Sequence, residues 1–259
     1  MDSENNFGMY HMHVELIKML FDFNKICKKA DITYSLGFGS MLGAVREHGI
    51  IPWDDDIDVI IDRTNFAKLQ NAVDSSAIYV LERENSETLW VPRFRYRNKK
   101  SREYAYELTI DVFIIDNVPD SKWLARIKML TIFALQGMIK HQLNLKKGNA
   151  IQKVASLFTY IVGRLFPISF KFYVFNKLVV FPKHSEECAC YTAEFAYAKY
   201  QFNSRLLEET IEMEFDGCMI PVSKNYDSYL TKIYGDYMTP PEKSEQIPKH
   251  FKDCGIKKI

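Results

Sequence analysis

The chain has 259 residues, of which 47% are hydrophobic, 14% aromatic and 26% charged, so it is neither a disordered nor a fibrous protein. This length suits one domain with a large insertion or two small domains. Five irregularly spaced cysteines, with no secretory signal pattern at the polar amino terminus, predict a reduced, cytoplasmic protein.

The first 119 residues alternate between helical and strand patterns, which is typical of an α/β or α+β sheet domain. Apolar residues at three- and four-residue steps predict a helix over 13–30. Further helices are expected near 40–46 and 65–73. Apolar or alternating runs predict strands at 32–36, 57–61, 77–81, 90–97 and 108–115.

The middle of the chain has an unusual charge. Between Ser121 and Ser185 there is no acidic residue, but there are eleven Lys and Arg residues. The remainder holds the other 23 basic residues and all 33 acidic ones, so an acidic body carries a basic, apolar middle. Helices are expected over 121–183, followed by a hairpin-like stretch at 213–222 and a helix near 226–234.

Carboxylates gather where the strand at 57–61 is expected. The alternation of a strand would place Asp54, Asp56 and Asp58 on one face. Neighbouring carboxylates repel one another by on the order of 1 kcal/mol per close pair, and a divalent cation would offset that repulsion. Asp111, in a second apolar strand, is a further candidate ligand, with a buried salt bridge as the alternative. Hard oxygen ligands favour Mg²⁺ or Mn²⁺.

A glycine-rich turn, Gly37-Phe38-Gly39-Ser40, precedes these carboxylates by about sixteen residues. Backbone amides in such a turn, at the start of a helix, can bind phosphate. Arg46 is placed to neutralise phosphate charge, although it could be an ordinary surface arginine. The order of Gly39-Ser40, Asp56-x-Asp58 and then Asp111 resembles the nucleotidyltransferase superfamily fold.

A longer resemblance narrows the family. The run from Gly37 to Asp58, GFGSMLGAVREHGIIPWDDDID, closely resembles the signature of the LicD family, and so does Ile110-Asp111-Val112-Phe113. A third match combines Phe215-Asp216-Gly217 with Tyr234-Gly235-Asp236-Tyr237. The LicD family includes bacterial phosphocholine transferases that modify cell-surface glycans, and it resembles the fukutin group, which transfers ribitol phosphate.

The resemblance implies a nucleotidyltransferase-like α+β fold, with a mixed sheet flanked by helices. We expect a catalytic core over 1–120, a basic, mainly helical insertion over 121–200 and a carboxy-terminal segment over 201–259 that completes the catalytic domain. The implied donor is CDP-choline or another CDP-alcohol. The implied acceptor is a hydroxyl of a cell-surface glycan or of its lipid-linked precursor, and CMP is the leaving group.

The resemblance also implies roles for the matching residues. The expected ligands of Mg²⁺ (or Mn²⁺) are Asp54, Asp56, Asp58 and Asp111. The residues expected to bind the donor are Gly39, Ser40, Arg46 and Trp53. The residues expected to act in catalysis are Asp56, Asp58, Asp111 and Arg46. Asp111 would accept the proton of the acceptor hydroxyl, and Arg46 would stabilise the departing CMP.

Two other functions remain open. A nucleotidyltransferase would use the same carboxylates to attach a nucleotide to a small molecule, sugar or protein, and it would release pyrophosphate. A non-catalytic scaffold on the same fold is the second. The basic stretch 121–183 either lies as amphipathic helices on an anionic membrane, at its inner face, or forms a helical subdomain over the sheet. No nucleic-acid partner is expected, because no binding motif accompanies the basic stretch.

Three smaller patterns have two interpretations each. His184, Cys188 and Cys190 are either zinc ligands or an unrelated histidine with buried free cysteines. Arg93, Arg95 and Arg97 alternate on a probable strand, where they meet an anionic substrate or form a solvated face. Aromatic residues that could surround a choline ammonium, or simply belong to the core, are Trp53, Trp90, Tyr96, Tyr104 and Tyr234.

Overall fold

The computed structural model describes residues 9–82, 90–97, 108–140, 149–193 and 195–248. The chain forms two compact units. The first unit comprises Met1–Glu82, Arg93–Phe113 and Arg205–Ile259, and the second comprises Arg83–Pro92 and Ile114–Ser204. Tyr104 lies outside the described residues. The division into a catalytic core (1–120), a helical insertion (121–200) and a carboxy-terminal segment that completes the catalytic domain (201–259) stays a prediction.

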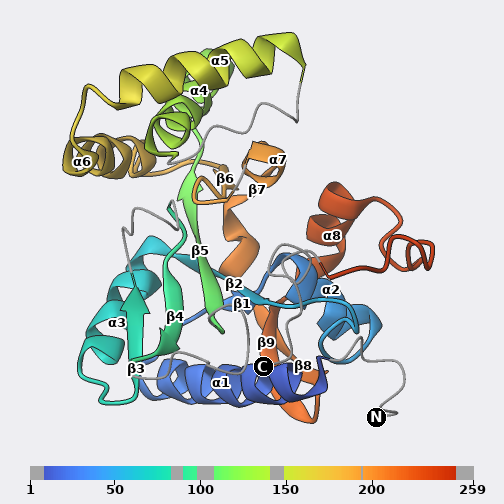
Figure 1. Cartoon of the computed structure of the whole chain (residues 1–259). Helices are drawn as coiled ribbons and strands as arrows, with labels where there is room; N and C mark the ends of the chain where they lie inside the picture. The colour runs from blue at the N-terminus through green and yellow to red at the C-terminus, as the bar shows by residue number, and fades with distance from the viewer. Residues whose placement is uncertain (1–8, 83–89, 98–107, 141–148, 194, 249–259) are drawn as a thin grey trace, which may run out of the picture. The chain divides into compact units, whose positions relative to one another are not determined.

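A sheet with the strand order β1-β2-β5-β4-β3 is the centre of the first unit (Figure 1). Its strands are β1 (Ser35–Leu36), β2 (Ile57–Asp62), β3 (Tyr79–Glu82), β4 (Arg93–Tyr96) and β5 (Ile110–Asn117), of which β5 ends in the second unit. The accompanying helices are α1 (Tyr10–Lys29), α2 (Phe38–Arg46), α3 (Arg63–Asp74) and α8 (Tyr226–Tyr234). Together with the helices of the second unit, this arrangement confirms the predicted α+β class.

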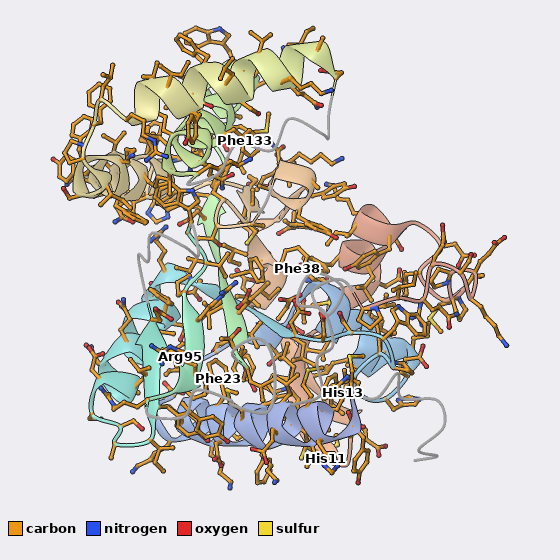
Figure 2. All side chains as sticks on the ribbon, in the orientation of Figure 1. His11, His13, Phe23, Phe38, Arg95 and Phe133 are labelled. Atoms are coloured by element: carbon orange, nitrogen blue, oxygen red, sulfur yellow. The ribbon has the colours of Figure 1, made fainter. Side chains whose placement is uncertain are left out.

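The long amphipathic helix α1 packs on the sheet through its apolar face. Phe23 is fully buried, and its ring meets Tyr34 and Phe94 edge-on at centroid distances of 5.0 and 5.1 Å (Figure 2). Such edge-to-face contacts add about 0.5–1.5 kcal/mol to the area that the rings bury. The helix begins at Tyr10, three residues before the predicted start, and Met12 in this additional part is fully buried.

Strand β2 is buried on both faces, which corrects the alternation expected for it. Ile57, Val59, Ile60 and Ile61 are all inaccessible to solvent. A strand covered on both faces has a continuous apolar run instead of alternating polar and apolar residues. Asp54 and Asp56 precede the strand, so the pleat of β2 does not place them on one face with Asp58.

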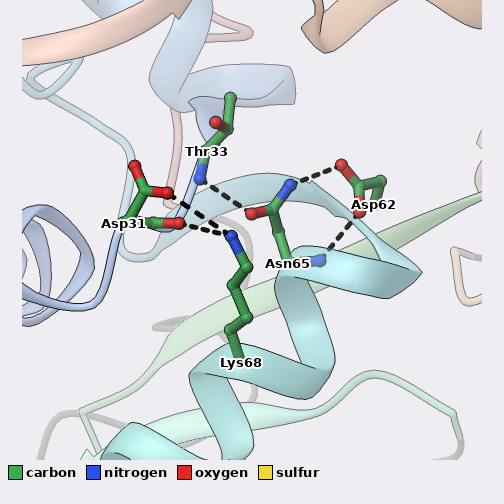
Figure 3. Close-up of polar contacts among 5 residues, drawn as sticks. All are labelled: Asp31, Thr33, Asp62, Asn65 and Lys68. Carbon is green, nitrogen blue, oxygen red and sulfur yellow. Dashed lines mark hydrogen bonds and ion pairs between the residues drawn. The ribbon is translucent and has the colours of Figure 1, made fainter.

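The helix that follows β2 is fixed by a polar network at its amino end (Figure 3). The Asp62 carboxylate caps α3 by accepting a hydrogen bond of 2.8 Å from the Asn65 backbone N–H. The Asn65 side-chain oxygen accepts from the Thr33 N–H at 3.1 Å, just before β1. Lys68 donates to the Asp31 carbonyl at 2.7 Å. These hydrogen bonds join the start of α3 to the end of β2 and to the segment that precedes β1.

A carboxy-terminal hairpin, β8 (Thr210–Phe215) and β9 (Cys218–Ser223), also belongs to the first unit. Its two-residue turn, Asp216-Gly217, has φ values of 50° and 80°, which is the geometry favoured for Asp-Gly in tight hairpins. Ser223 N–H donates to the Ser35 hydroxyl at 2.8 Å. The hairpin is therefore fastened to β1.

The second unit is mainly helical, with α4 (Lys122–Ile139), α5 (Ala150–Gly163), α6 (Ile168–Val179) and α7 (Phe195–Ala198). Two three-residue strands that the sequence did not indicate, β6 (Glu187–Ala189) and β7 (Gln201–Asn203), pair with each other, and β6 pairs with the end of β5. Trp90 is buried in the core of this unit, stacked on Phe175 at 4.1 Å. Trp90 is therefore a core residue.

Two buried lysines hold helix ends in the second unit. The Lys128 ammonium donates to the carbonyls of Asn117, Val179 and Phe181 at 2.7, 3.0 and 2.6 Å. The Lys171 ammonium donates to the carbonyls of Met138 and Gly163 at 3.1 and 3.0 Å. The two ammonium groups therefore satisfy carbonyls at or next to the ends of α4, α5 and α6, where the helix itself supplies no donor. Lys128 also satisfies the carbonyl of the last residue of β5.

Candidate functional site

Three consecutive carboxylates lie together in the loop before β2. One ligand oxygen from each of Asp54, Asp55 and Asp56 lies within 4.8 Å of the other two. Asp55 is buried, and Asp54 and Asp56 are half-buried. Closely spaced carboxylate oxygens are the donor set that Mg²⁺ and Mn²⁺ prefer. This carboxylate cluster could hold a metal ion, as expected for this part of the sequence.

His13 of α1 holds the loop of the carboxylate cluster from one side. Its Nε2 lies 2.7 Å from the backbone carbonyl oxygen of Asp54 (Figure 2). A carbonyl only accepts, so this ring nitrogen carries a proton and donates it. Burial lowers the pKa of His13, while the Asp54 carbonyl and the charges of Asp216 and Asp55 act in the opposite direction. The ring is therefore a neutral donor near neutral pH.

Asp216, in the turn of the β8–β9 hairpin, holds the same loop from another direction. Its carboxylate accepts from the Ile50 N–H at 2.8 Å, and its own N–H donates to the His48 carbonyl at 2.8 Å. A Cβ on Gly49 would lie 2.6 Å from the Asp216 carboxyl carbon, so any larger residue here would displace that carboxylate. Burial raises the pKa of Asp216, and the Ile50 N–H and His13 oppose that rise.

The start of α2 lies directly against the carboxylate cluster. A Cβ on Gly39 would approach an Asp54 carboxylate oxygen to 2.5 Å, so the absence of a side chain lets the helix and the carboxylate meet. The buried Ser40 hydroxyl accepts from the Asp58 N–H at 2.9 Å. Ser40 therefore joins α2 to β2 through the main chain of a predicted metal ligand.

Asp58 and Asp111 are not members of the carboxylate cluster. Asp58 is buried in β2. The Asp111 carboxylate forms an ion pair with Arg93 at 3.1 Å and accepts a hydrogen bond of 3.1 Å from the Thr109 hydroxyl. The salt bridge that was the alternative for Asp111 is thus present, and its functional role stays a prediction.

The other arginines of the predicted triplet also have partners within the first unit. Arg95 pairs with Glu82 at 3.0 Å (Figure 2). Arg97 donates to the carbonyls of Ser76 and Tyr79 at 3.0 and 3.2 Å. These contacts give Arg95 and Arg97 structural roles at the β3–β4 edge.

Arg46 ends α2, and Trp53 lies in the loop that carries the carboxylate cluster. The Arg46 side chain is largely buried at the end of α2, where it donates to Glu47 at 2.7 Å and to the Tyr237 carbonyl at 3.0 Å. Arg46 thus joins α2 to the carboxy-terminal segment. Trp53 is half-buried and directly precedes Asp54. The roles of both residues toward a donor stay predictions.

The histidine and cysteines considered for zinc do not form a ligand group among the residues that the structure describes. His184 is exposed, whereas Cys188 and Cys190 are buried. Burial raises the pKa of the Cys190 thiol to about 12. The Cys188 thiol lies 3.4 Å from the Asn203 carbonyl, which indicates a structural role.

Three residues of this site were not found from the sequence as participants: His13, Asp55 and Asp216. Strand alternation that begins at Asp54 places Asp55 on the opposite face, so this pattern does not predict Asp55 as a ligand. Asp216 was part of a recognised motif, Phe215-Asp216-Gly217, but received no role. His13 carried no local signal, since its contact with Asp54 spans 41 positions.

An α+β sheet with carboxylates at the entrance to a buried strand, next to a glycine-rich helix start, is consistent with the nucleotidyltransferase-like fold that the sequence predicted. A family model described as the nucleotidyltransferase domain of LicD, FKTN and FKRP matches residues 31–117. The resemblance to the LicD family that the sequence predicted is therefore confirmed over residues 31–117.

Known proteins resemble the chain to different extents. The lipopolysaccharide cholinephosphotransferase LicD of Haemophilus influenzae is 26% identical over 93% of this chain and 95% of its own length. An uncharacterized protein of Rickettsia typhi is 29% identical over 41% of this chain and 30% of its own length. An uncharacterized protein of Rickettsia prowazekii is 39% identical over 22% of this chain and 21% of its own length. The predicted resemblance to the LicD family thus extends over nearly the whole chain, and the relative that it matches there is named as a transferase.

Proposed function

We propose that this protein transfers phosphocholine, or a related phospho-alcohol, from a CDP-linked donor to a glycan hydroxyl and releases CMP. The observation that carries the proposal is the similarity to a lipopolysaccharide cholinephosphotransferase over 93% of the chain. The acceptor is a cell-surface glycan or its lipid-linked precursor, which would place the reaction at the inner face of the cell membrane.

The carboxylate cluster is the proposed metal site. Asp54, Asp55 and Asp56 supply closely spaced oxygen donors, and Asp58 follows at the start of β2. Three like charges in one loop repel one another, so the loop favours a bound divalent cation. When bound, Mg²⁺ (or Mn²⁺) neutralises phosphate oxygens and thereby lowers the barrier to phosphoryl transfer.

The remaining residues position the reactants in this proposal. The first backbone N–H groups of α2, around Gly39 and Ser40, face the diphosphate. Arg46 stabilises the charge of the departing CMP. Asp111, oriented by Arg93 and the Thr109 hydroxyl, accepts the acceptor's proton. A bond then forms between the acceptor oxygen and the phosphorus that carries the alcohol, and the bond from that phosphorus to CMP breaks.

Release of CMP from purified protein tests the proposal. The protein is incubated with Mg²⁺ and a panel of CDP-alcohols, with and without candidate glycans. Each donor is repeated with Asp58→Asn and with Asp31→Asn, which makes the same chemical change on a fully exposed side chain. CMP release from one donor, lost in Asp58→Asn and kept in Asp31→Asn, supports the proposal and identifies the alcohol.

A nucleotidyltransferase is the second candidate, because the family model itself is described as a nucleotidyltransferase domain. It predicts pyrophosphate from CTP or ATP and no CMP from any CDP-alcohol, with the same dependence on Asp58. A scaffold on the same fold would release neither product, and the Asp58→Asn variant would retain its biological function.

A further inference from the structure

The outer side of α5 is an apolar stripe that faces solvent. Its members recur at three- and four-residue steps, so they lie on one face of the helix and in the turn that follows it. Ile151 is 80% exposed and Phe158 is 66% exposed. The complete stripe, called the α5 face below, consists of Ile151, Val154, Phe158, Ile161 and Leu165.

The opposite side of α5 is already packed. Gly137 of α4 lies against Thr159, and Gly163 lies against the backbone of Met138. These glycines let the two helices approach closely, so α5 rests on α4 while its other side points outward (Figure 1). Large apolar side chains left in water forgo about 25 cal/mol per Å² of surface that burial would gain. A contiguous apolar stripe of this kind marks an interaction surface.

The charge around the α5 face selects its partner. No Asp or Glu occurs from Ser121 to Ser185, whereas eleven Lys and Arg residues do. Among the exposed cations, Arg164 is held over the Tyr160 ring at 4.6 Å and Lys177 lies over the Tyr173 ring at 5.7 Å. Two copies joined through this surface would bring cations against cations, which is unfavourable. A negatively charged surface complements it.

We propose that the α5 face docks the helical unit onto the surface of an anionic lipid bilayer. Apolar and aromatic side chains flanked by lysine and arginine are the composition of helices that lie in a membrane interface. Trp123 of α4 is 70% exposed, and tryptophan is enriched at membrane–water interfaces.

The helix lengths fit docking on the surface. Among the described helices none is long and apolar enough to cross a membrane by itself. Helices α5 and α6 satisfy that criterion only together, with a bend of 117° between them. The 14 residues of α5 extend about 21 Å, which is shorter than the roughly 30 Å of a hydrocarbon core. Lying in the interface buries the α5 face without crossing the bilayer.

Vesicle binding by the full-length protein tests the docking. Flotation is measured with phosphatidylcholine vesicles that contain phosphatidylglycerol and with pure phosphatidylcholine vesicles. The variant is Phe158→Ser, and the matched control is Ile78→Ser, because Ile78 is 60% exposed in the first unit. Both positions face solvent, so both variants should fold, which circular dichroism and thermal melting verify.

The expected result is binding to the anionic vesicles that weakens in salt and is at least about tenfold weaker for pure phosphatidylcholine. Phe158→Ser should reduce partitioning by about tenfold, and Ile78→Ser should change it by less than about twofold. Absent anionic-vesicle binding, or equal partitioning of wild type and Phe158→Ser, overturns the proposal. So does a wild-type dimer that Phe158→Ser dissociates. Since no donor is present, these outcomes leave the proposed reaction untouched.

Discussion

The contact between Gly39 and Asp54 allows a sharp test of the carboxylate cluster. In Gly39→Ala the new Cβ would lie 2.5 Å from the Asp54 carboxylate oxygen, whereas an ordinary contact starts at 3.4 Å, so the carboxylate must move by about 0.9 Å. That oxygen is the end of a flexible side chain and can rotate away. A displacement of about 1 Å in a catalytic constellation costs about 100-fold, or about 2.7 kcal/mol.

The stability of Gly39→Ala should change little. Alanine is favoured over glycine in helices by about 0.5–1 kcal/mol, and this gain offsets the rotation of Asp54. We therefore expect Mn²⁺ affinity and CMP release to fall by about 100-fold, while the free energy of unfolding stays within about 1 kcal/mol of wild type. Titration calorimetry with Mn²⁺ and urea unfolding measure the two quantities.

Gly43→Ala is the matched control in the same helix. Its Cβ would strike the backbone carbonyl oxygen of Gly49, which cannot rotate away. Overpacking against backbone should lower the free energy of unfolding by about 1–3 kcal/mol. If Gly39→Ala binds Mn²⁺ like the wild type, Asp54 does not bind the metal. If instead Gly39→Ala lowers the free energy of unfolding as much as Gly43→Ala does, the claim that Gly39 affects the carboxylate cluster without affecting stability is wrong.

Two further predictions concern buried cationic or titratable groups. Burial lowers the pKa of His13, so below about pH 6.5 the unfolded chain binds the proton more readily. The free energy of unfolding should therefore fall as the pH drops from about 6.5 toward the lowered pKa of His13 in the folded protein. In His13→Gln, the urea midpoint should lack this dependence on pH. Lys128→Met leaves three carbonyls without their donor and should cost on the order of 2–4 kcal/mol in urea unfolding. The exposed Lys122→Met should stay within about 0.5 kcal/mol of wild type.

The spacing of apolar residues correctly predicted those helices and strands in which buried residues recur at regular steps. The predicted helix at 226–234 coincides with α8, and the strand near 108–115 corresponds to β5. Strand β2 was located correctly, but its side-chain directions were not, because it is covered on both faces. Strands β6 and β7 span three residues each, which is too short for a period to show. Strand β6 pairs with β5 and with β7, so these strands form through contacts that are distant in the sequence.

The candidate site was predictable as far as its chemistry is local. Consecutive aspartates after a glycine-rich turn indicated a metal site, and Asp54 and Asp56 do lie in the carboxylate cluster. The contacts that shape the loop could not be predicted. The bond between the Ile50 N–H and Asp216 spans 166 positions, and it joins a main-chain donor that every residue type except proline possesses.

The geometry of the carboxylate cluster therefore depends on residues outside the matched domain of residues 31–117. His13 precedes that domain and Asp216 follows it, yet both hydrogen-bond to the main chain of the loop. Each bond contributes about 1 kcal/mol, which is comparable with the repulsion between two neighbouring carboxylates. Because the hydrogen bonds of His13 and Asp216 act on the backbone, they fix the path of the loop. The positions of the carboxylate oxygens then depend on the side-chain rotamers of the aspartates. Gly39, which leaves space for Asp54, then decides which rotamer is available.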